Sequence, residues 1–265
     1  AAAAAAAATD TWKAFEIWHK VIRGFQGSMS LPPSLLSLEA IDIGLNEDNT
    51  TGFRRLLECS QNLRHLDVSH NRLSGAAMRV LGPALTVQEK LASLTADDCF
   101  DDSHGMSTAV HVIGGNHQLT HVSLRRNFLD AGIGKALGSA MSKQPTLTSL
   151  KLGGAKRFKL GDDGLNSLSK SIKTCKKLQR LDLAITGLID GNGAVSLAAA
   201  VAGNPKLKIL DLEGNSLSVP TAQALLQALQ LRMNSRMEVV KLEGNVKIPS
   251  SLLFAIQNLC VPPIA

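Results

Sequence analysis

Tyrosine is absent from this chain of 265 residues, and aromatic side chains make up only 3% of it. Apolar residues still account for 45% of the sequence, so aliphatic side chains, chiefly leucine and alanine, must fill the core. The chain also lacks any run of 18 or more apolar residues, which is the length that a membrane-spanning helix needs. We therefore expect a folded domain without a membrane span.

Cysteines are few and scattered. The four are Cys59, Cys99, Cys175 and Cys260, and no two of them form a Cys-x-x-Cys pair. This spacing predicts neither a disulfide framework nor a zinc site, and it fits a reducing intracellular compartment. We expect a cytoplasmic protein, with a cytoskeletal or ciliary location left open.

The start of the chain is unusual, because it lacks an initial methionine and a basic-then-apolar leader. No signal peptide is therefore expected. The run Ala1–Ala8 is interpreted as backbone whose true side chains are not identified. On this interpretation the chain is a fragment of a longer polypeptide, held within a larger assembly.

A pattern of leucines and one asparagine recurs along the chain. It is clearest as Leu207-x-x-Leu210-x-Leu212-x-x-Asn215-x-Leu217. Copies begin at residues 35, 63, 91, 119, 147, 178, 207 and 237, at spacings of 28, 28, 28, 28, 31, 29 and 30. The apolar positions predict a short strand against a core, and the asparagine can bond to backbone groups of the following turn.

This period and consensus are the signature of leucine-rich repeats. Helix-like runs lie between the copies, at Ala76–Leu85, Gly132–Met141, Ala194–Val201 and Thr221–Leu229. A strand and a full helix in 28 to 31 residues resembles the ribonuclease-inhibitor-like subclass. The resemblance implies an α/β horseshoe of about eight repeats, with a parallel sheet on the concave face and helices on the convex face. We expect the solenoid to occupy residues 35–258, followed by a tail at 259–265.

Residues 1–34 are expected to form an N-terminal capping helix and a linker. The apolar side chains of the helix recur at spacings of 3, 3, 4 and 3, as Trp12, Phe15, Trp18, Ile22 and Phe25. Either Asp10 or Thr11 could cap its first turn. We interpret the helix as a cover for the first repeat, with a docking helix for a partner as the alternative.

Alternation along each strand should direct the third, fifth, seventh and eighth positions of the repeat to the concave face. The face then begins acidic, becomes basic in the fourth and fifth repeats, and ends mixed but mostly acidic. The candidates for partner binding on it are Asp67, Asp97, Asp98, Arg125, Arg126 and Lys151. The alternative is that these charges only keep the sheet soluble.

Basic residues gather between residues 151 and 180. This segment holds nine basic and two acidic residues, a net charge of +7, whereas the whole chain carries +6. It includes the longest repeat and an irregular loop at Gly153–Gly161. The further candidates for partner binding are Lys156, Arg157, Lys159 and Lys173. An acidic protein surface would suit them, and nucleic acid is not expected because Phe158 is the segment's single aromatic residue.

No pattern in the sequence predicts catalysis, a metal or a cofactor. His117 and His121 have the spacing of a helical metal pair, but the segment crosses from a turn into a strand. Gly132-x-Gly134-Lys135 lacks the full phosphate-loop spacing, and we assign its glycines to the repeat turn. Cys99 takes the asparagine position of its repeat, where a buried thiol is a structural substitute. We therefore predict that the protein is not an enzyme.

The sequence favours a scaffold that positions one or more protein partners in a larger complex. Leu119–Leu137 and Leu147–Leu183 resemble the actin-regulatory CARMIL proteins, and ciliary or axonemal leucine-rich-repeat subunits share the same consensus. One alternative is a GTPase activator resembling the Ran GTPase-activating family, although the acidic segment of that family is not found after the repeats. Another is the ligand-sensing region of an innate immune receptor. The partner and the oligomeric state stay open.

Overall fold

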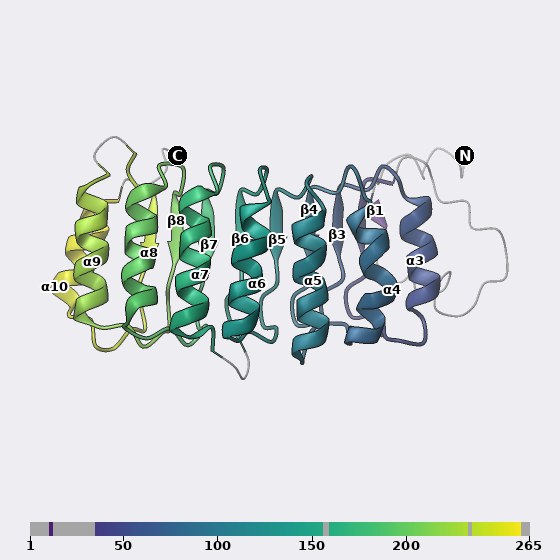
Figure 1. Cartoon of the computed structure of the whole chain (residues 1–265), viewed down its shortest axis with the longest axis horizontal. Coiled ribbons are helices and arrows are strands. Elements are labelled where there is room, and N and C mark those ends of the chain that lie inside the picture. The colour runs from purple at the N-terminus through teal and green to yellow at the C-terminus, as the bar shows by residue number, and fades with distance from the viewer. Residues whose placement is uncertain (1–10, 13–34, 156–158, 233–234, 261–265) are drawn as a thin grey trace, which may run out of the picture.

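The computed structural model describes residues 11–12, 35–155, 159–232 and 235–260. Figure 1 shows one parallel sheet with a layer of helices across one of its faces. The strands are β1 (Thr11–Trp12), β2 (Ser37–Glu39), β3 (His65–Asp67), β4 (Ser93–Thr95), β5 (His121–Ser123), β6 (Ser149–Lys151), β7 (Arg180–Asp182), β8 (Ile209–Asp211) and β9 (Val239–Lys241). The helices are α3 (Thr50–Cys59), α4 (Gly75–Thr86), α5 (Ser103–Gly115), α6 (Ala131–Ser142), α7 (Gly161–Thr174), α8 (Asn192–Gly203), α9 (Val219–Gln230) and α10 (Ser250–Asn258).

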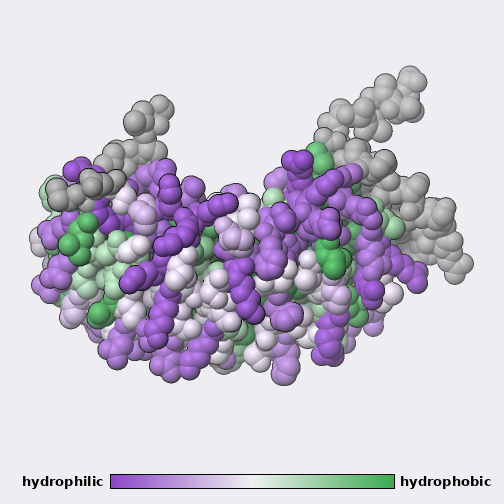
Figure 2. Space-filling view, turned by 45° about the horizontal axis from the view of Figure 1, so that its top comes forward, coloured by the Kyte–Doolittle hydropathy of each residue, from purple (hydrophilic) through white to green (hydrophobic). Residues whose placement is uncertain are grey.

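The strands lie side by side in chain order from β1 to β9, and every pair is parallel. Equivalent residues of successive repeats pair in register, so that Leu38 lies opposite Leu66 and Leu66 opposite Leu94. The middle residue of each strand from β2 to β9 is buried beneath the helices. The predicted leucine-rich-repeat horseshoe, with a concave parallel sheet and convex helices, is confirmed, and Figure 2 shows the curvature of the arc.

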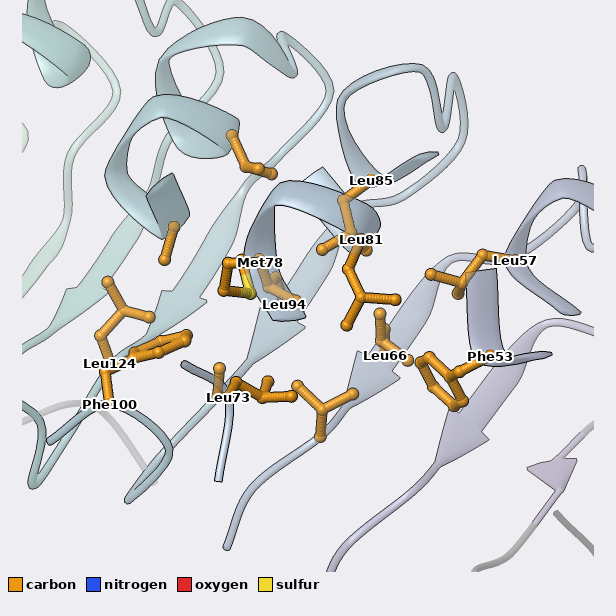
Figure 3. Close-up of a pocket in the computed structure, with 14 residues that line it drawn as sticks. Phe53, Leu57, Leu66, Leu73, Met78, Leu81, Leu85, Leu94, Phe100 and Leu124 are labelled. Atoms are coloured by element: carbon orange, nitrogen blue, oxygen red, sulfur yellow. The ribbon is translucent and has the colours of Figure 1, made fainter. Parts of the chain in front are cut away.

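The core is a continuous column of aliphatic side chains, as the shortage of aromatics predicted. Leu66 and Leu94 of adjacent strands pack beneath Leu81 of α4 (Figure 3). Phe53 and Phe100 lie at the two sides of this group and are almost completely buried. The closed apolar void among these side chains measures only about 10 Å³. Burial of each large aliphatic side chain contributes about 1.5–3 kcal/mol, so stacking of repeats supplies most of the stability.

The N-terminal prediction was wrong for Thr11 and Trp12. Both were assigned to the start of a capping helix, but they form strand β1, which pairs with Ser37 and Leu38 of β2. Without β1, the backbone groups at this edge of β2 would have no partner in the sheet, and a strand satisfies them where a helix would not. The remainder of the predicted helix and its linker lies outside the described residues.

Where strands lead to helices, buried side chains form a ladder of hydrogen bonds to the backbone of their own turns and, except at Thr186, to the preceding repeat. This asparagine ladder consists of Asn71, Cys99, Asn127, Thr186, Asn215 and Asn245. Asn71 is typical: its Oδ1 accepts from the Leu45 backbone N–H at 2.9 Å, and its Nδ2 donates to the Ala40 carbonyl at 2.7 Å. The backbone polar groups that the predicted asparagine was expected to satisfy are therefore those of its own turn and the preceding repeat.

A second ladder runs along the opposite rim, where helices lead back to strands. This helix-end ladder consists of Gln88, Asn116, Gln144, Cys175, Asn204 and Arg232. Asn204 Nδ2, for example, donates to the carbonyls of Ile172 at 2.8 Å and Cys175 at 3.1 Å. These bonds satisfy carbonyls that the end of a helix leaves without an intrahelical partner. The sequence analysis missed this ladder, because its rungs differ from repeat to repeat.

Candidate protein-binding surfaces

The fold separates the candidate residues onto three surfaces. Asp67, Asp97, Asp98, Arg125, Arg126 and Lys151 lie at or next to the concave face, as the strand alternation predicted. Lys159 lies on the strand-to-helix rim, just before α7, and Lys173 lies on the helix-to-strand rim, in the last turn of α7. Lys156 and Arg157 lie outside the described residues.

Arg125 and Asp182 form an ion pair across the middle of the concave face. Arg125 Nε donates to Asp182 Oδ2 at 2.7 Å, and Nη2 bonds to the same oxygen. The pair spans two repeats, because it passes over the strand that leads to Gly153. A Cβ atom on Gly153 would lie 2.6 Å from Asp182 Oδ1, so the missing side chain there makes room for the pair.

The acidic candidates mostly hold neighbouring repeats together. Asp97 Oδ1 accepts from Ser123 Oγ at 2.7 Å and from the Arg125 backbone N–H at 2.8 Å. Asp67 Oδ1 accepts from the Ser69 N–H at 2.9 Å within its own turn. These carboxylates are partly committed to the scaffold, so they are weaker contacts for a partner than their sequence positions suggested.

Asp98 belongs to an open polar groove near the N-terminal end of the arc. Its Oδ2 lies 3.3 Å from Nδ1 of His70. The groove measures about 380 Å³, and Asp42, Arg72 and Asp101 also line it. Three carboxylates and one arginine line the groove, so its charge is mostly but not wholly acidic.

Arg126 and Lys151 keep their charged groups available on the concave face. Arg126 is exposed, and its stem lies against Gly154, where an added Cβ would come within 3.2 Å of Arg126 Cγ. Lys151 is half-buried and stands opposite Ser123 in the sheet register. Together with exposed His121 on β5, they form a basic centre on the face.

The C-terminal part of the face is less acidic than the sequence predicted. Asp182 and Asp211 are 0% and 5% exposed, because basic side chains of nearby strands cover them. Arg125 covers the first, and Lys241 Nζ lies 3.4 Å from Asp211 Oδ2. Strand alternation predicts only the side of the sheet to which a side chain points. It does not predict that basic side chains of other strands cover these carboxylates.

The basic segment between residues 151 and 180 does not form one surface. Lys159 lies along Gly187 on the strand-to-helix rim, where an added Cβ would meet Lys159 Cγ at 2.5 Å. Lys173, Lys176 and Lys177 are exposed on the opposite rim, because helix α7 carries the chain across the molecule. The fold therefore divides a charge cluster that is continuous in sequence.

Comparisons with known proteins agree with this architecture. The profile of the family described as "Leucine Rich repeat" matches residues 59–82. Mouse ribonuclease inhibitor is 26% identical over 241 residues, which cover 77% of this chain. The chain has a leucine-rich-repeat fold and is similar to ribonuclease inhibitor. It matches about half, 51%, of the length of that relative.

Other matches are more partial. Mouse NACHT, LRR and PYD domains-containing protein 4E is 29% identical over 169 residues, which cover 63% of this chain and 17% of the relative. The structure of the leiomodin-1 actin-binding site 2 aligns with a TM-score of 0.46 and 13% identity, over 58% of this chain and 87% of that one. The tropomodulin C-terminal domain of Caenorhabditis elegans aligns with a TM-score of 0.47 and 14% identity, over 60% and 92%.

The histidines and cysteines of the repeats have structural positions. His117 lies in a turn and His121 on β5, so the two rings do not share a helix face, as predicted. Within the described residues, no group of three or more His, Cys, Asp or Glu side chains could hold a metal ion. Burial raises the pKa of the Cys99 thiol to about 12, which suits a rung of the asparagine ladder and not a nucleophile.

The glycines near Lys135 have a packing role. Gly132 and Gly134 lie inside α6 and not in a turn, which corrects the prediction. A Cβ on Gly134 would lie 2.7 Å from the Gly164 Cα of α7, so glycine allows close packing of the two helices. Lys135 Nζ lies 3.3 Å from Asp163 Oδ2.

Each helix in the described part of the chain is too short or too polar to cross a membrane.

Proposed function

We propose that this chain is a non-enzymatic scaffold whose concave face binds a protein partner within a larger cytoplasmic assembly, cytoskeletal or ciliary. The observation that carries the proposal is the continuous parallel sheet, which presents polar side chains in register over the whole arc. An open, extended face of this kind suits a protein partner, whereas small molecules are usually bound in enclosed pockets. One relative is by its name an inhibitor of ribonuclease, which supports a binding role for such repeats.

The basic centre is the proposed principal contact. Arg126 and His121 are exposed and Lys151 is half-buried, so these groups can meet acidic side chains of a partner. Arg125 is held by Asp182 and contributes to the shape of the face. We assign a flanking contact to the loop that contains Lys156, Arg157 and Lys159, because irregular loops of a rigid scaffold often carry function.

The cysteines support the proposed compartment. Cys59, Cys99, Cys175 and Cys260 are all free thiols, and two of them serve as rungs of the ladders. Free thiols at such structural positions suit a reducing environment.

Crosslinking mass spectrometry on the native complex tests this role, followed by binding of the identified partner to a double variant, Arg126→Glu with Lys151→Gln. We expect crosslinks to one defined protein and a fall in affinity of about tenfold or more, since reversal of an interface charge typically costs over 1 kcal/mol. The matched control is Arg79→Glu with Arg55→Gln, both exposed on convex helices. Intramolecular crosslinks alone, or equal binding by the two double variants, would contradict a concave protein-binding face.

A second candidate function has one observation in its favour. The match to mouse NACHT, LRR and PYD domains-containing protein 4E covers only 17% of that protein, which is by name a multidomain protein with leucine-rich repeats. On this proposal, the chain is the ligand-sensing repeat region of a larger receptor. A nucleotide-binding domain encoded upstream in the same full-length protein would support it, and its absence would exclude this reading.

A further inference from the structure

We propose that the helix-to-strand rim in the C-terminal half of the arc is a second docking surface, which binds an acidic polypeptide segment. The surface is formed by the loops that lead from α6 to β6, from α7 to β7 and from α8 to β8. Its exposed cationic side chains, called here the lysine rim, are Lys143, Lys173, Lys176, Lys177 and Lys206. The proposal adds a surface to the scaffold role and does not depend on the concave contact.

Hydrogen bonds hold the three loops next to one another, and the Gln179 N–H donates to the Thr148 carbonyl at 2.8 Å between the first two. Asn204 Nδ2 donates to the Cys175 carbonyl at 3.1 Å, just before Lys176 and Lys206 in their respective loops. The Lys208 N–H donates to the Gln179 carbonyl at 2.8 Å, so the loops stay in register up to the strands. Figure 2, in which the upper rim of Figure 1 comes forward, shows hydrophilic side chains along much of this rim.

The charge of the lysine rim is not neutralised within the described part of the chain. Residues 142–148, 173–179 and 203–208 contain six lysines and no acidic residue. Lys208 pairs with Glu238 at 2.6 Å, whereas none of the five rim lysines has an ion pair among the described residues. Among the equivalent loops of the N-terminal half, residues 59–64 and 114–120 hold one arginine and no lysine, and residues 86–92 hold Lys90 together with Glu89. The positive charge is therefore a local property of three adjacent loops and not of the repeat.

Stabilisation of helix ends does not account for these lysines. A cation favours the negative end of a helix only within about the last turn, and α7 ends at Thr174. Lys173 meets that condition, but Lys176 and Lys177 lie beyond the helix. The helix-end ladder already satisfies carbonyls there, since Asn204 bonds to the Ile172 carbonyl. Function on the surface is therefore the simpler explanation for the cluster.

The shape and composition of the lysine rim favour an acidic polypeptide over nucleic acid. The three loops contain no aromatic residue on which a base could stack. Neighbouring strands lie about 4.8 Å apart, so three loops span roughly 10 Å on the sheet side and more on the helix side. A short extended segment of about four to eight residues covers that width, at about 3.3 Å per residue. A duplex-binding protein that makes about six to ten phosphate contacts needs more cations than these five lysines.

The test measures binding of a fluorescent peptide of about eight glutamates to the whole chain by anisotropy, at roughly 50 mM salt to limit screening. A glutamine peptide of the same length is the neutral probe. The variant is Lys173→Gln, Lys176→Gln and Lys177→Gln. The matched control is Arg55→Gln, Arg79→Gln and Lys90→Gln, which removes two exposed cations of convex helices and one from the N-terminal half of the same rim. We expect the rim variant to bind the glutamate peptide about tenfold or more weakly, and the control to change by less than about twofold.

Equal weakening in both triple variants would overturn the proposal, since it would show attraction to net charge only. Tighter binding of an oligonucleotide with the same number of charges would also overturn it and reassign the surface to nucleic acid. Exposed lysines contribute little to stability, so unchanged unfolding midpoints are expected for both variants. Arg126→Glu should leave peptide binding unchanged, which separates a failure of this proposal from a failure of the concave site.

Discussion

The two rims of the solenoid satisfy their buried backbone polar groups with different side chains. Each carries a ladder of side chains that bond to backbone groups of a preceding repeat. On the strand-to-helix rim, asparagine recurs as the rung, with Cys99 and Thr186 as substitutes. On the helix-to-strand rim, the rung is glutamine, asparagine, cysteine or arginine. The difference teaches that a recurring residue marks a tight geometric demand, whereas a looser demand leaves no consensus.

The reason lies in what each rung must do. An asparagine on the first rim both accepts and donates, as Asn127 does when it accepts from the Cys99 and Phe100 N–H groups at 2.7 and 2.8 Å and donates to the Ala96 carbonyl. On the second rim, the shared task is donation to carbonyls at a helix end, and Asn116 and Asn204 also accept from the N–H two residues further on. A longer side chain can perform it, as Gln144 shows with the carbonyls of Ile113 and Asn116.

The largest effect is expected at Arg232, the last described rung of the helix-end ladder. The residue is 3% exposed, and its guanidinium donates to the carbonyls of Val201, Asn204, Leu207 and Ser235 at 2.6 to 2.9 Å. Arg232→Ala should lower the free energy of unfolding by about 3–5 kcal/mol, since it leaves several buried carbonyls unpaired. Denaturant unfolding measures it. The exposed Arg236→Ala is the control, and a loss below about 1 kcal/mol at Arg232 would show that the rung is dispensable.

A smaller loss of stability is expected when the same substitution, asparagine to glutamine, is made on each rim. Asn127→Gln should cost about 2 kcal/mol or more, because the longer side chain cannot keep both its accepting and donating bonds in the turn. Asn116→Gln should cost only about 1 kcal/mol, because glutamine already donates to the helix-end carbonyls at residues 88 and 144, and the bond at risk is the one that Asn116 Oδ1 accepts from the Gln118 N–H. Thermal and denaturant midpoints of both variants give the comparison. Equal costs would mean that the rims do not differ in geometric demand.

The smallest expected effect is on the pH dependence of stability, through Asp190 on the strand-to-helix rim. Burial raises the pKa of Asp190, but hydrogen bonds from Ser218 and Thr221 outweigh it and hold the pKa below its ordinary value. A lowered folded-state pKa stabilises the protein above the unfolded-state pKa, and this contribution is lost as the pH falls through the folded-state value. Asp190→Asn should therefore reduce the loss of stability in acid. Urea unfolding from neutral pH downward tests this, and an unchanged slope would refute it.

Much of the fold was predictable, because the period of the repeat and the alternation along each strand are properties of the sequence itself. The asparagine ladder followed from Asn71, Asn127, Asn215 and Asn245, since a buried amide must find partners. Strand β1 was not predictable from its apolar spacing. A sheet edge that needs a partner is a property of the assembled repeats, and it decided the structure of Thr11 and Trp12.

The candidate surfaces were predictable only in part. Alternation placed Lys151 and its neighbours at the concave face, but it did not show that Arg125 reaches the carboxylate of a residue 57 positions away. The lysine rim was hidden for a related reason. Lys143 and Lys206 lie far in sequence from Lys176, and only stacking of the repeats brings them onto one rim.

The Arg125–Asp182 pair has a mechanical consequence. It ties two strands that are separated by a third, and it lies on the inner side of the curve. Straightening the arc stretches that side, so the tie is pulled in tension, whereas tighter bending slackens it. The molecule therefore has unequal stiffness in the two directions: it resists being opened more than being closed. A partner that fits the existing concave face leaves the ion pair intact. A partner that is too wide for the face has to open the arc and break the ion pair first.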